Sequence, residues 1–386
     1  MRIAELDVFV LKHALETPFA FSQGWVTQRA ATLVRLRADS GAEGWGEAFA
    51  QGLEPPEIAA AAIEHALKPL VIGADALAPS PLWHAMYART RDFGRKGSVV
   101  AAISAVDIAM WDLMGHALGQ PIHCLLGGAH RMAVQPYATG FYRLHGQGEA
   151  ERLADEARGH ADSGFRAMKV KLGFGVADDV AVMEAVAEAV RNRDVELMVD
   201  TNHAYGRAEA LALGRALERI DRDGVPIRWY EEPVAPEDTE GYAELRRTLS
   251  IPIAGGENEH TPFGFHNLFR AGAVDVAQPD IASCGGFTAA RDIAAMAHAA
   301  GVAVNPHVWG SAIAQAASIQ LIAALPVAHH SLHAREPLLE YDRSDHPFRR
   351  ALVRNPWDVE DGMVRVPPGP GLGIEVDMEA VERFSA

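Results

Sequence analysis

Three acidic residues stand at the ends of consecutive predicted strands. Asp200 ends the run VELMVD, Glu231 lies near the end of IRWYEEP, and Glu257 ends IPIAGGE. Because catalytic barrels gather side chains at the carboxyl ends of their strands, the three carboxylates are expected to converge. Hard oxygen ligands without cysteine or paired histidine favour Mg²⁺ over Zn²⁺ or copper. One such acid alone is more often a helix cap, but three in consecutive strands predict a metal site.

Two lysines lie two residues apart in the predicted strand AMKVKLG. Lys169 and Lys171 therefore point to the same face of that strand. A lone K-x-K is common on solvated strands, but two ammonium groups inside an apolar barrel strand need a reason to be buried. Mutual repulsion and a nearby metal ion are expected to lower the pKa of a lysine, which would supply a neutral amine as general base.

An aspartate and a histidine end the next two predicted strands. Asp280 ends VDVAQPD and His307 lies near the end of VAVNPHV. A hydrogen bond from one imidazole nitrogen to Asp280 would fix the tautomer and raise the basicity of the other nitrogen. The alternative is a structural histidine bonded to a local carbonyl group. On the last predicted strand, Glu340 is the candidate for a proton donor or a polar orienting group.

Eight short apolar strands carry these residues, at intervals of roughly thirty residues. Ala- and Glu-rich helical stretches separate most of them, which favours a closed parallel barrel, with an open doubly wound sheet as the alternative. The predicted strands are 133–140, 167–173, 195–200, 227–233, 251–257, 274–280, 302–308 and 337–342.

The first 125 or so residues have a different pattern. Alternating residues predict strands at 2–12 and 30–38, and helical patterns follow at 56–70 and 98–118. Ser98 is the expected N-cap of the second helix, whose apolar residues fall on one stripe. The tail from about residue 347 no longer follows the barrel rhythm and is expected to pack back on this N-terminal unit.

Composition excludes several classes of protein. With 51 acidic residues against 35 Lys plus Arg, the formal net charge is −16, which argues against a nucleic-acid or anionic-membrane partner. Two distant cysteines support neither a disulfide framework nor a thiolate metal site. The N-terminus lacks a signal-peptide pattern and no apolar run reaches the length of a membrane span, so a cytoplasmic protein is expected.

Seven motifs in order make this sequence resemble the enolase superfamily, and within it the mandelate racemase/muconate lactonizing enzyme family. They are K-V-K at 169–171, D-T-N at 200–202, Y-E-E-P at 230–233, G-E-N at 256–258, Q-P-D at 278–280, N-P-H at 305–307 and L-E-Y-D at 339–342. The resemblance implies a modified TIM barrel of (β/α)7β type with an α+β capping domain. The expected division is a capping domain over 1–128, the barrel over 129–345 and a returning segment over 346–386.

The resemblance also implies roles for individual residues. Mg²⁺ would be held by Asp200, Glu231 and Glu257. Lys171 would be the base on one face of the substrate, with Lys169 beside it. His307, supported by Asp280, would act on the opposite face. Glu340 would bind substrate or help neutralise an enediolate, and Asn202 would line the site.

The substrate is expected to be a small carboxylate. Further motifs, among them N-P-H-V-W-G at 305–310, look similar to galactarolactone cycloisomerase-like members, which implies a sugar acid or its lactone. Segment 17–25, ending at Trp25, looks like the loop that closes over substrate. His203, Tyr137, His145 and Trp309 would form a polar, aromatic wall, although packing between cap and barrel explains such residues equally well.

Several outcomes stay open at this level. Proton removal beside the carboxylate would lead to elimination or ring opening by a cycloisomerase or dehydratase. Bases on both faces, Lys171 and His307, suit a racemase or epimerase as well. A metal-dependent aldolase on the same barrel is a more distant alternative. The resemblance implies a homo-oligomer, either a dimer or an octamer.

Overall fold

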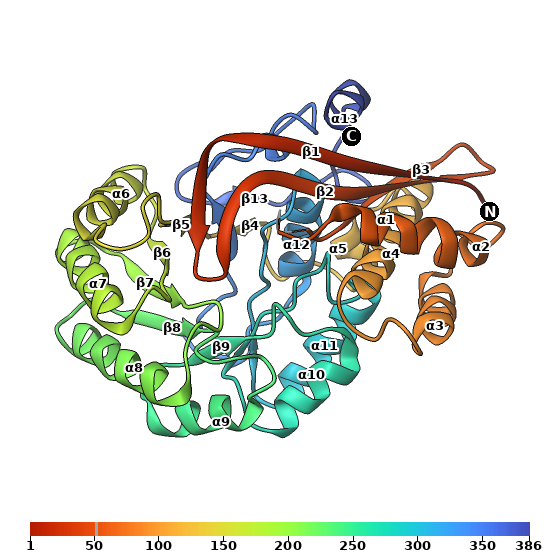
Figure 1. Ribbon diagram of the computed structural model, residues 1–386. Coiled ribbons are helices and arrows are strands. Elements are labelled where there is room, and N and C mark those ends of the chain that lie inside the picture. The colour runs from red at the N-terminus through yellow and green to blue at the C-terminus, as the bar shows by residue number, and fades with distance from the viewer. Residues whose placement is uncertain (51–52) are drawn as a thin grey trace.

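A curled sheet of parallel strands forms the centre of the protein. The computed structural model describes residues 1–50 and 53–386. Eight strands pair in the order β11-β10-β9-β8-β7-β6-β5-β12, and every pairing is parallel (Figure 1). They are β5 (Pro136–Gly140), β6 (Ala167–Lys171), β7 (Glu196–Asp200), β8 (Ile227–Glu231), β9 (Ile253–Gly255), β10 (Val276–Ala277), β11 (Ala303–Val304) and β12 (Leu339–Asp342). All eight predicted strands are confirmed, each shorter than its predicted range.

A helix separates each strand from the next, and the last strand has none after it before the chain leaves the barrel. This gives the predicted (β/α)7β barrel, and the open doubly wound sheet is wrong. Figure 1 shows the helices following one another around the outside of the strands. The strands are buried because helices cover their outer face. The helices are α6 (Ala150–Asp162), α7 (Val176–Val190), α8 (Arg207–Arg222), α9 (Thr239–Thr248), α10 (Thr261–Arg270), α11 (Gly286–Ala299) and α12 (Ala312–Ala324).

The N-terminal unit is an antiparallel three-stranded sheet with helices packed on it. Strands β1 (Ile3–Phe21), β2 (Gly24–Ala38) and β3 (Glu43–Ala48) pair in sequence order. The predicted ranges 2–12 and 30–38 are therefore too short. The missing part is a long hairpin with its turn at Ser22 and Gln23, and its pairing is irregular between Ala14 and Phe19, around Pro18. In Figure 1 this hairpin reaches across to the barrel strands.

Helices complete the capping unit. They are α1 (Pro56–Ala62), η1 (Ile63–Leu67), α2 (Lys68–Val71), α3 (Pro79–Thr90), α4 (Ser98–Leu118) and α5 (Ile122–Leu125). Helix α3 was not predicted, because its prolines resemble a loop signal, although Pro79 fits the first turn of a helix. The predicted N-cap is wrong: Ser98 is the first helical residue, and Gly97 precedes it at φ 71°.

Helix α4 forms the core between the capping sheet and the barrel. Every residue from Val100 to Gly115 is buried. The helix is therefore buried on all sides, and not along the single apolar stripe that was expected. It is long and apolar enough to cross a membrane by composition, but 83% of the relevant stretch is buried inside the protein. This degree of burial is typical of a helix in a protein core.

The C-terminal segment contains η2 (Pro347–Arg349), β13 (Val364–Arg365) and α13 (Met378–Phe384). Strand β13 pairs with the short β4 (Ala133–Val134) ahead of the barrel. Near the chain end, the Leu372 amide donates to Asp112 of α4 at 2.7 Å, and the Ala386 amide donates to the Val10 carbonyl at 2.9 Å. The segment thus touches the capping unit, while the division at 128 and 345 stays a prediction.

Candidate active site

Three carboxylates meet above the carboxyl ends of β7, β8 and β9. One oxygen from each of Asp200, Glu231 and Glu257 lies within 4.8 Å of the others, and all three residues are buried. Burial raises the pKa of Glu231 to about 8, and the charges of Asp200, Glu340 and Glu257 add to it against the opposing effect of Lys169. So many buried carboxylates destabilise one another unless a cation compensates them. The donor set fits a hard divalent cation.

A fourth buried acid at this place was missed. Glu232 accepts hydrogen bonds from Asn258 at 2.9 Å and Asn202 at 3.5 Å. Its pKa is raised well above the usual range, first by burial and then by the charge of Glu257. The second glutamate of Y-E-E-P was the available signal. Its backbone has φ 45°, outside the strand region, so the alternation of side chains along a strand does not predict where this side chain lies.

Both lysines of β6 reach the carboxylates. The Lys169 ammonium lies 2.6 Å from Glu231, 2.8 Å from Glu340 and 3.6 Å from Asp200. Lys171 donates to Asp200, and to the Asn202 side chain at 3.1 Å.

Without a bound cation, the lysine pKa values are shifted upward, so the expected lowering stays a prediction for the metal-bound site. Burial by itself lowers the pKa of Lys171, but Asp200 and the other carboxylates outweigh it and the net shift is upward. The pKa of Lys169 is raised further, because Glu231 and Glu340 outweigh its burial. The sequence argument counted the repulsion between the lysines and the effect of a nearby metal ion, and it did not count the acids that surround the lysines.

The histidine and the aspartate form a pair. His307 donates through Nδ1 to Asp280 at 2.7 Å, which leaves Nε2 directed away from Asp280, 3.5 Å from Glu257. The partner is therefore a carboxylate and not a local carbonyl group. Burial lowers the pKa of His307, but Glu257, Glu340 and Asp280 together raise it to about 10.

Glu340 lies between the two basic groups. Besides its contact with Lys169, it accepts a hydrogen bond from the Val308 amide at 3.0 Å. Burial raises the pKa of Glu340, but Lys169, His307 and Lys171 outweigh it and lower the pKa to about 2. An ionised carboxylate accepts hydrogen bonds and orients its neighbours, so the lowered pKa favours the orienting role, and both roles stay predictions.

A small chamber lies among these groups. Its volume is about 10 Å³, roughly the space of one water molecule. The tip of the β1–β2 hairpin covers it: Ser22 donates to the Thr201 carbonyl at 2.9 Å, and Gln23 donates to the Asn202 carbonyl at 2.7 Å. The chamber is lined by Phe21, Tyr142, Lys171, Asn202, Glu257, His307 and Trp309.

The predicted substrate wall is only partly assembled there. Asn202 and Trp309 line the chamber, whereas Tyr137 is fully buried inside the barrel against Trp229. Trp25 is 48% exposed on the hairpin, and neither His203 nor the exposed His145 is among the lining residues. Phe21 and Tyr142 were missed, although Phe21 lies in the predicted closing segment and Tyr142 comes two residues after β5.

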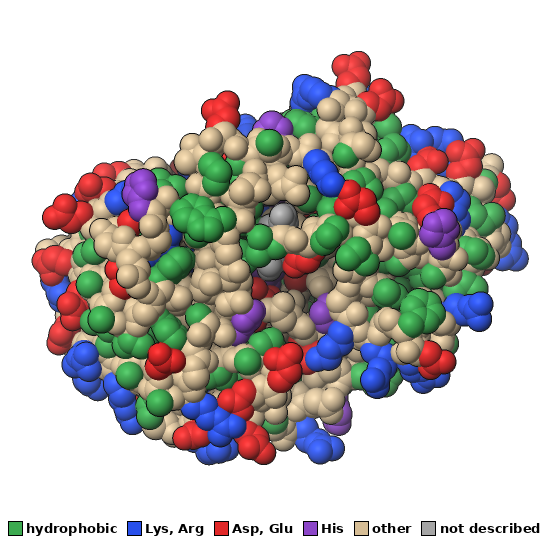
Figure 2. Space-filling model, in the orientation of Figure 1, with side chains coloured by type: hydrophobic (Ala, Val, Ile, Leu, Met, Phe, Trp, Pro, Cys, Tyr) green, Lys and Arg blue, Asp and Glu red, His purple; other side chains and the backbone are tan. Residues whose placement is uncertain are grey.

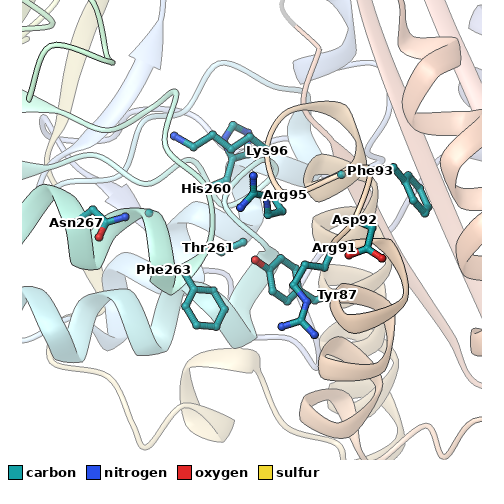
Figure 3. Close-up of a pocket in the computed structure, with 12 residues that line it drawn as sticks. Tyr87, Arg91, Asp92, Phe93, Arg95, Lys96, His260, Thr261, Phe263 and Asn267 are labelled. Carbon is teal, nitrogen blue, oxygen red and sulfur yellow. The ribbon is translucent and has the colours of Figure 1, made fainter.

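Size alone does not identify the site. A larger hollow of about 700 Å³ lies between the loop after α3 and the start of α10, where Figure 3 shows Tyr87 and Arg91 opposite Phe263. None of the predicted catalytic residues lines it. Acidic and basic side chains are interspersed over the outer face in Figure 2, so surface charge does not identify the site either.

Sequence comparison places this architecture in a known family. Residues 5–127 match the mandelate racemase/muconate lactonizing enzyme N-terminal domain, and residues 152–381 match the enolase C-terminal domain-like family. The chain belongs to the mandelate racemase/muconate lactonizing enzyme family of the enolase superfamily. It is therefore an enzyme of that family.

Individual relatives narrow the reaction type. The chain is 39% identical to a D-galactarolactone cycloisomerase of Agrobacterium fabrum, covering 100% of this chain and 99% of the relative. It is 34% identical to an arabinonate dehydratase of Saccharolobus solfataricus, covering 90% and 89%. A racemase from Streptomyces coelicolor, solved with bound magnesium, superposes with a TM-score of 0.86 at 30% identity, covering 100% of both chains. Cycloisomerases and dehydratases of sugar acids thus support the same general reaction type for this member of the family.

Proposed function

We propose that this enzyme removes the proton beside the carboxylate of a sugar acid or its lactone, with Mg²⁺ bound, and then expels an oxygen from the adjacent carbon. The observation that carries the proposal is the shared chamber of Lys171, His307 and Glu257. A base, an acid and a metal ligand around one small space are what carbon-acid chemistry requires.

Asp200, Glu231 and Glu257 would hold the metal ion. Bound Mg²⁺ would supply Lewis-acid stabilisation of the negative charge that develops on the carboxylate oxygens of the substrate. Burial, together with the charges of neighbouring carboxylates, raises the pKa of Glu231 to about 8, which supports this fit because a dication compensates buried carboxylates. Asp200 bonds to Lys171 in this structure, so a cation on Asp200 would weaken the contact that keeps Lys171 protonated.

Lys171 would take the α-proton onto Nζ, and the electron pair of the broken C–H bond would move into an enediolate of the substrate. Lys169, fully buried and adjacent, would offset the second negative charge. The enediolate would then expel the β-oxygen. His307 would give its Nε2 proton to that leaving oxygen, since its Nδ1 is bonded to Asp280 and Nε2 is the nitrogen left to act.

A racemase or epimerase remains the second candidate. His307 and Lys171 both line the chamber, and a proton returned by His307 to the α-carbon would invert its configuration. The two candidates share the first step and differ in what the enediolate does next.

Incubation in D₂O with a panel of sugar acids and lactones tests the proposal. We expect magnesium-dependent formation of a dehydrated or ring-opened product, read by mass spectrometry and by keto-acid detection. Deuterium exchange into recovered or epimerised substrate, without such a product, would favour the racemase. Retro-aldol fragments would contradict both candidates.

A further inference from the structure

The last strand of the capping sheet carries a buried carboxylate to the barrel. Glu47 of β3 is 1% exposed. It accepts hydrogen bonds from the Ser311 amide at 2.9 Å, from the Ser311 hydroxyl, and from the Ala314 amide at 3.1 Å. Ser311 precedes α12 and Ala314 lies in its first turn, where backbone amides have no partner inside the helix. The capping unit thus supplies the acceptor for the start of a barrel helix.

Helix α12 begins directly after the loop that carries His307. Buried charged side chains hold the backbone of residues 308–311. Glu340 accepts from the Val308 amide at 3.0 Å, Arg349 donates to the Gly310 carbonyl at 3.0 Å, and Glu47 accepts from the Ser311 amide. Of these three side chains, only that of Glu47 comes from the capping unit. The loop next to His307 is therefore fixed from two sides, by the barrel with its C-terminal segment and by the capping sheet.

The end of β3 also reaches the partner of the histidine. The Phe49 amide donates to the Ala282 carbonyl at 3.0 Å, and the Ala282 amide donates to Asp280 at 2.7 Å. The Phe49 ring meets the His307 ring edge to face, with the ring centres 5.6 Å apart. One strand of the capping sheet thus contacts both loops whose side chains form the pair of His307 and Asp280.

Gly310 shows how closely Glu47 approaches the loop. A Cβ at this position would lie 2.7 Å from Glu47 Oε1 and 2.6 Å from the Ala314 Cβ, closer than side-chain carbons pack. Any side chain at position 310 would therefore displace the loop or the carboxylate. The contact depends on both residues, so it can be disturbed independently from either side.

We propose that Glu47 is a positioning residue for His307, and that docking of the capping strand β3 aligns the Nε2 proton of His307 with the leaving oxygen. This inference rests on the proposed function, in which His307 protonates the β-oxygen as its bond to carbon breaks. A misplacement of about 1 Å can lower a rate about 10²-fold. Lys171 lies on β6, away from this loop, so loss of Glu47 slows the departure of the oxygen and spares the removal of the α-proton.

The test measures product formation and deuterium exchange at the α-carbon in the same D₂O sample, with the panel of sugar acids and lactones described above. Their ratio does not depend on the fraction of a variant that is folded. Glu47→Ala should lower kcat for product about 10- to 100-fold and leave KM and the exchange rate within about threefold. The ratio of exchange to product should therefore rise at least about tenfold. Glu47→Gln keeps one carbonyl acceptor and should restore part of kcat.

A second variant and a matched control separate positioning from stability. Gly310→Ala disturbs the same contact from the loop and should raise the ratio as Glu47→Ala does, so it decides the matter with Glu47→Gln if Glu47→Ala fails to fold. Glu218 of α8 is 4% exposed and accepts from the Ser250 amide at 2.7 Å and the Ser250 hydroxyl at 2.9 Å, ahead of β9 at the opposite end of the barrel. Glu218→Ala should lower Tm and leave the ratio unchanged.

The outcomes distinguish the inference from the proposed function. If the ratio stays at the parent value in the Glu47 and Gly310 variants, or rises equally in Glu218→Ala, the inference is overturned and the proposed function is left intact. A parent enzyme that forms no dehydrated or ring-opened product from any member of the panel removes the proposed function, and the inference with it.

Discussion

Two groups of buried carboxylates differ in their hydrogen-bond partners. One group lies in the interface between the capping unit and the barrel, and the other lies at the barrel mouth. In the interface, Asp107 of α4 accepts from the Thr288 amide at 2.9 Å and the Thr288 hydroxyl at 2.6 Å. Asp112 accepts from the amides of Trp45 and Leu372 at 2.8 and 2.7 Å. At the barrel mouth, Asp200 and Glu231 face lysines, and Glu257 Oε2 makes no hydrogen bond within the described residues, although His307 Nε2 lies 3.5 Å from it.

The difference separates acids that hold the fold from the acids that we propose to bind the metal ion. Both groups are buried, and burial raises the pKa of Asp107 to about 7 and of Asp112 to about 6, so a shifted pKa does not distinguish them. Backbone amides and a hydroxyl donate hydrogen bonds to the interface acids, and His116 lies 3.6 Å from Asp112, so these acids have partners within the protein. The mouth acids crowd one another and are compensated only in part by the two lysines, which is the arrangement expected of a site for a metal ion.

The largest expected effect is that of metal removal. Chelation should reduce turnover to background, because the charge on the developing enediolate is then uncompensated. Added Mg²⁺ should restore turnover and raise Tm. Glu231→Gln should show neither the restoration nor the rise in Tm, whereas Asp107→Asn, the matched change in the interface, should show both. Full turnover in the presence of chelator would contradict the metal site.

Loss of the proposed base comes next. Lys171→Ala should lower kcat about 10²- to 10⁴-fold, because one positioned base contributes that much. Lys68→Ala, which removes an exposed lysine paired with Glu64, is the control and should leave kcat unchanged. Deuterium exchange at the α-carbon gives a second readout. If exchange in the Lys171 variant remains as fast as in the parent, another group is the base.

A smaller effect is expected from the partner of the histidine. Asp280→Asn removes one of the charges that raise the pKa of His307 to about 10. The pKa should fall, so His307 loses its proton at lower pH and the alkaline limb of the kcat profile should move to lower pH. We also expect kcat to fall about 10²-fold at neutral pH. Asp107→Asn should leave the profile in place, and a shift of equal size in that variant would show that the effect is not specific to the site.

The barrel and the metal triad were predictable because each follows from a local pattern. An apolar run that ends in an acid predicts a strand, and it predicts that the acidic side chain lies at the carboxyl end of the barrel, as for Asp200 and Glu231. The capping hairpin was predicted only in part, since Pro18 and the irregular pairing around it break the alternation.

The contact between Tyr142 and Trp309 could not be predicted from the sequence. Tyr142 and Trp309 are adjacent only because two loops meet under the hairpin, and their lack of partners is a property of the assembled chamber. The direction of the pKa shift of Lys171 without a cation could not be predicted for the same reason, since it depends on Asp200, which is contributed by the neighbouring strand.

The smallest expected effect concerns stability in the interface. The folded-state pKa of Asp107 is raised from 3.8 to about 7, so the folded protein holds this proton more firmly than the unfolded chain. Between these values unfolding releases a proton, and the free energy of unfolding should therefore fall as pH rises from about 4 to about 7 and level off above it. The full change is at most about 4 kcal/mol for a shift of this size. Asp107→Asn cannot titrate, so urea unfolding at a series of pH values should give a shallower slope for the variant, while its kcat stays near that of the parent. Parallel slopes would mean that Asp107 is ionised in the folded protein, and the proposed contrast between the interface acids and the mouth acids would then rest on hydrogen-bond partners alone.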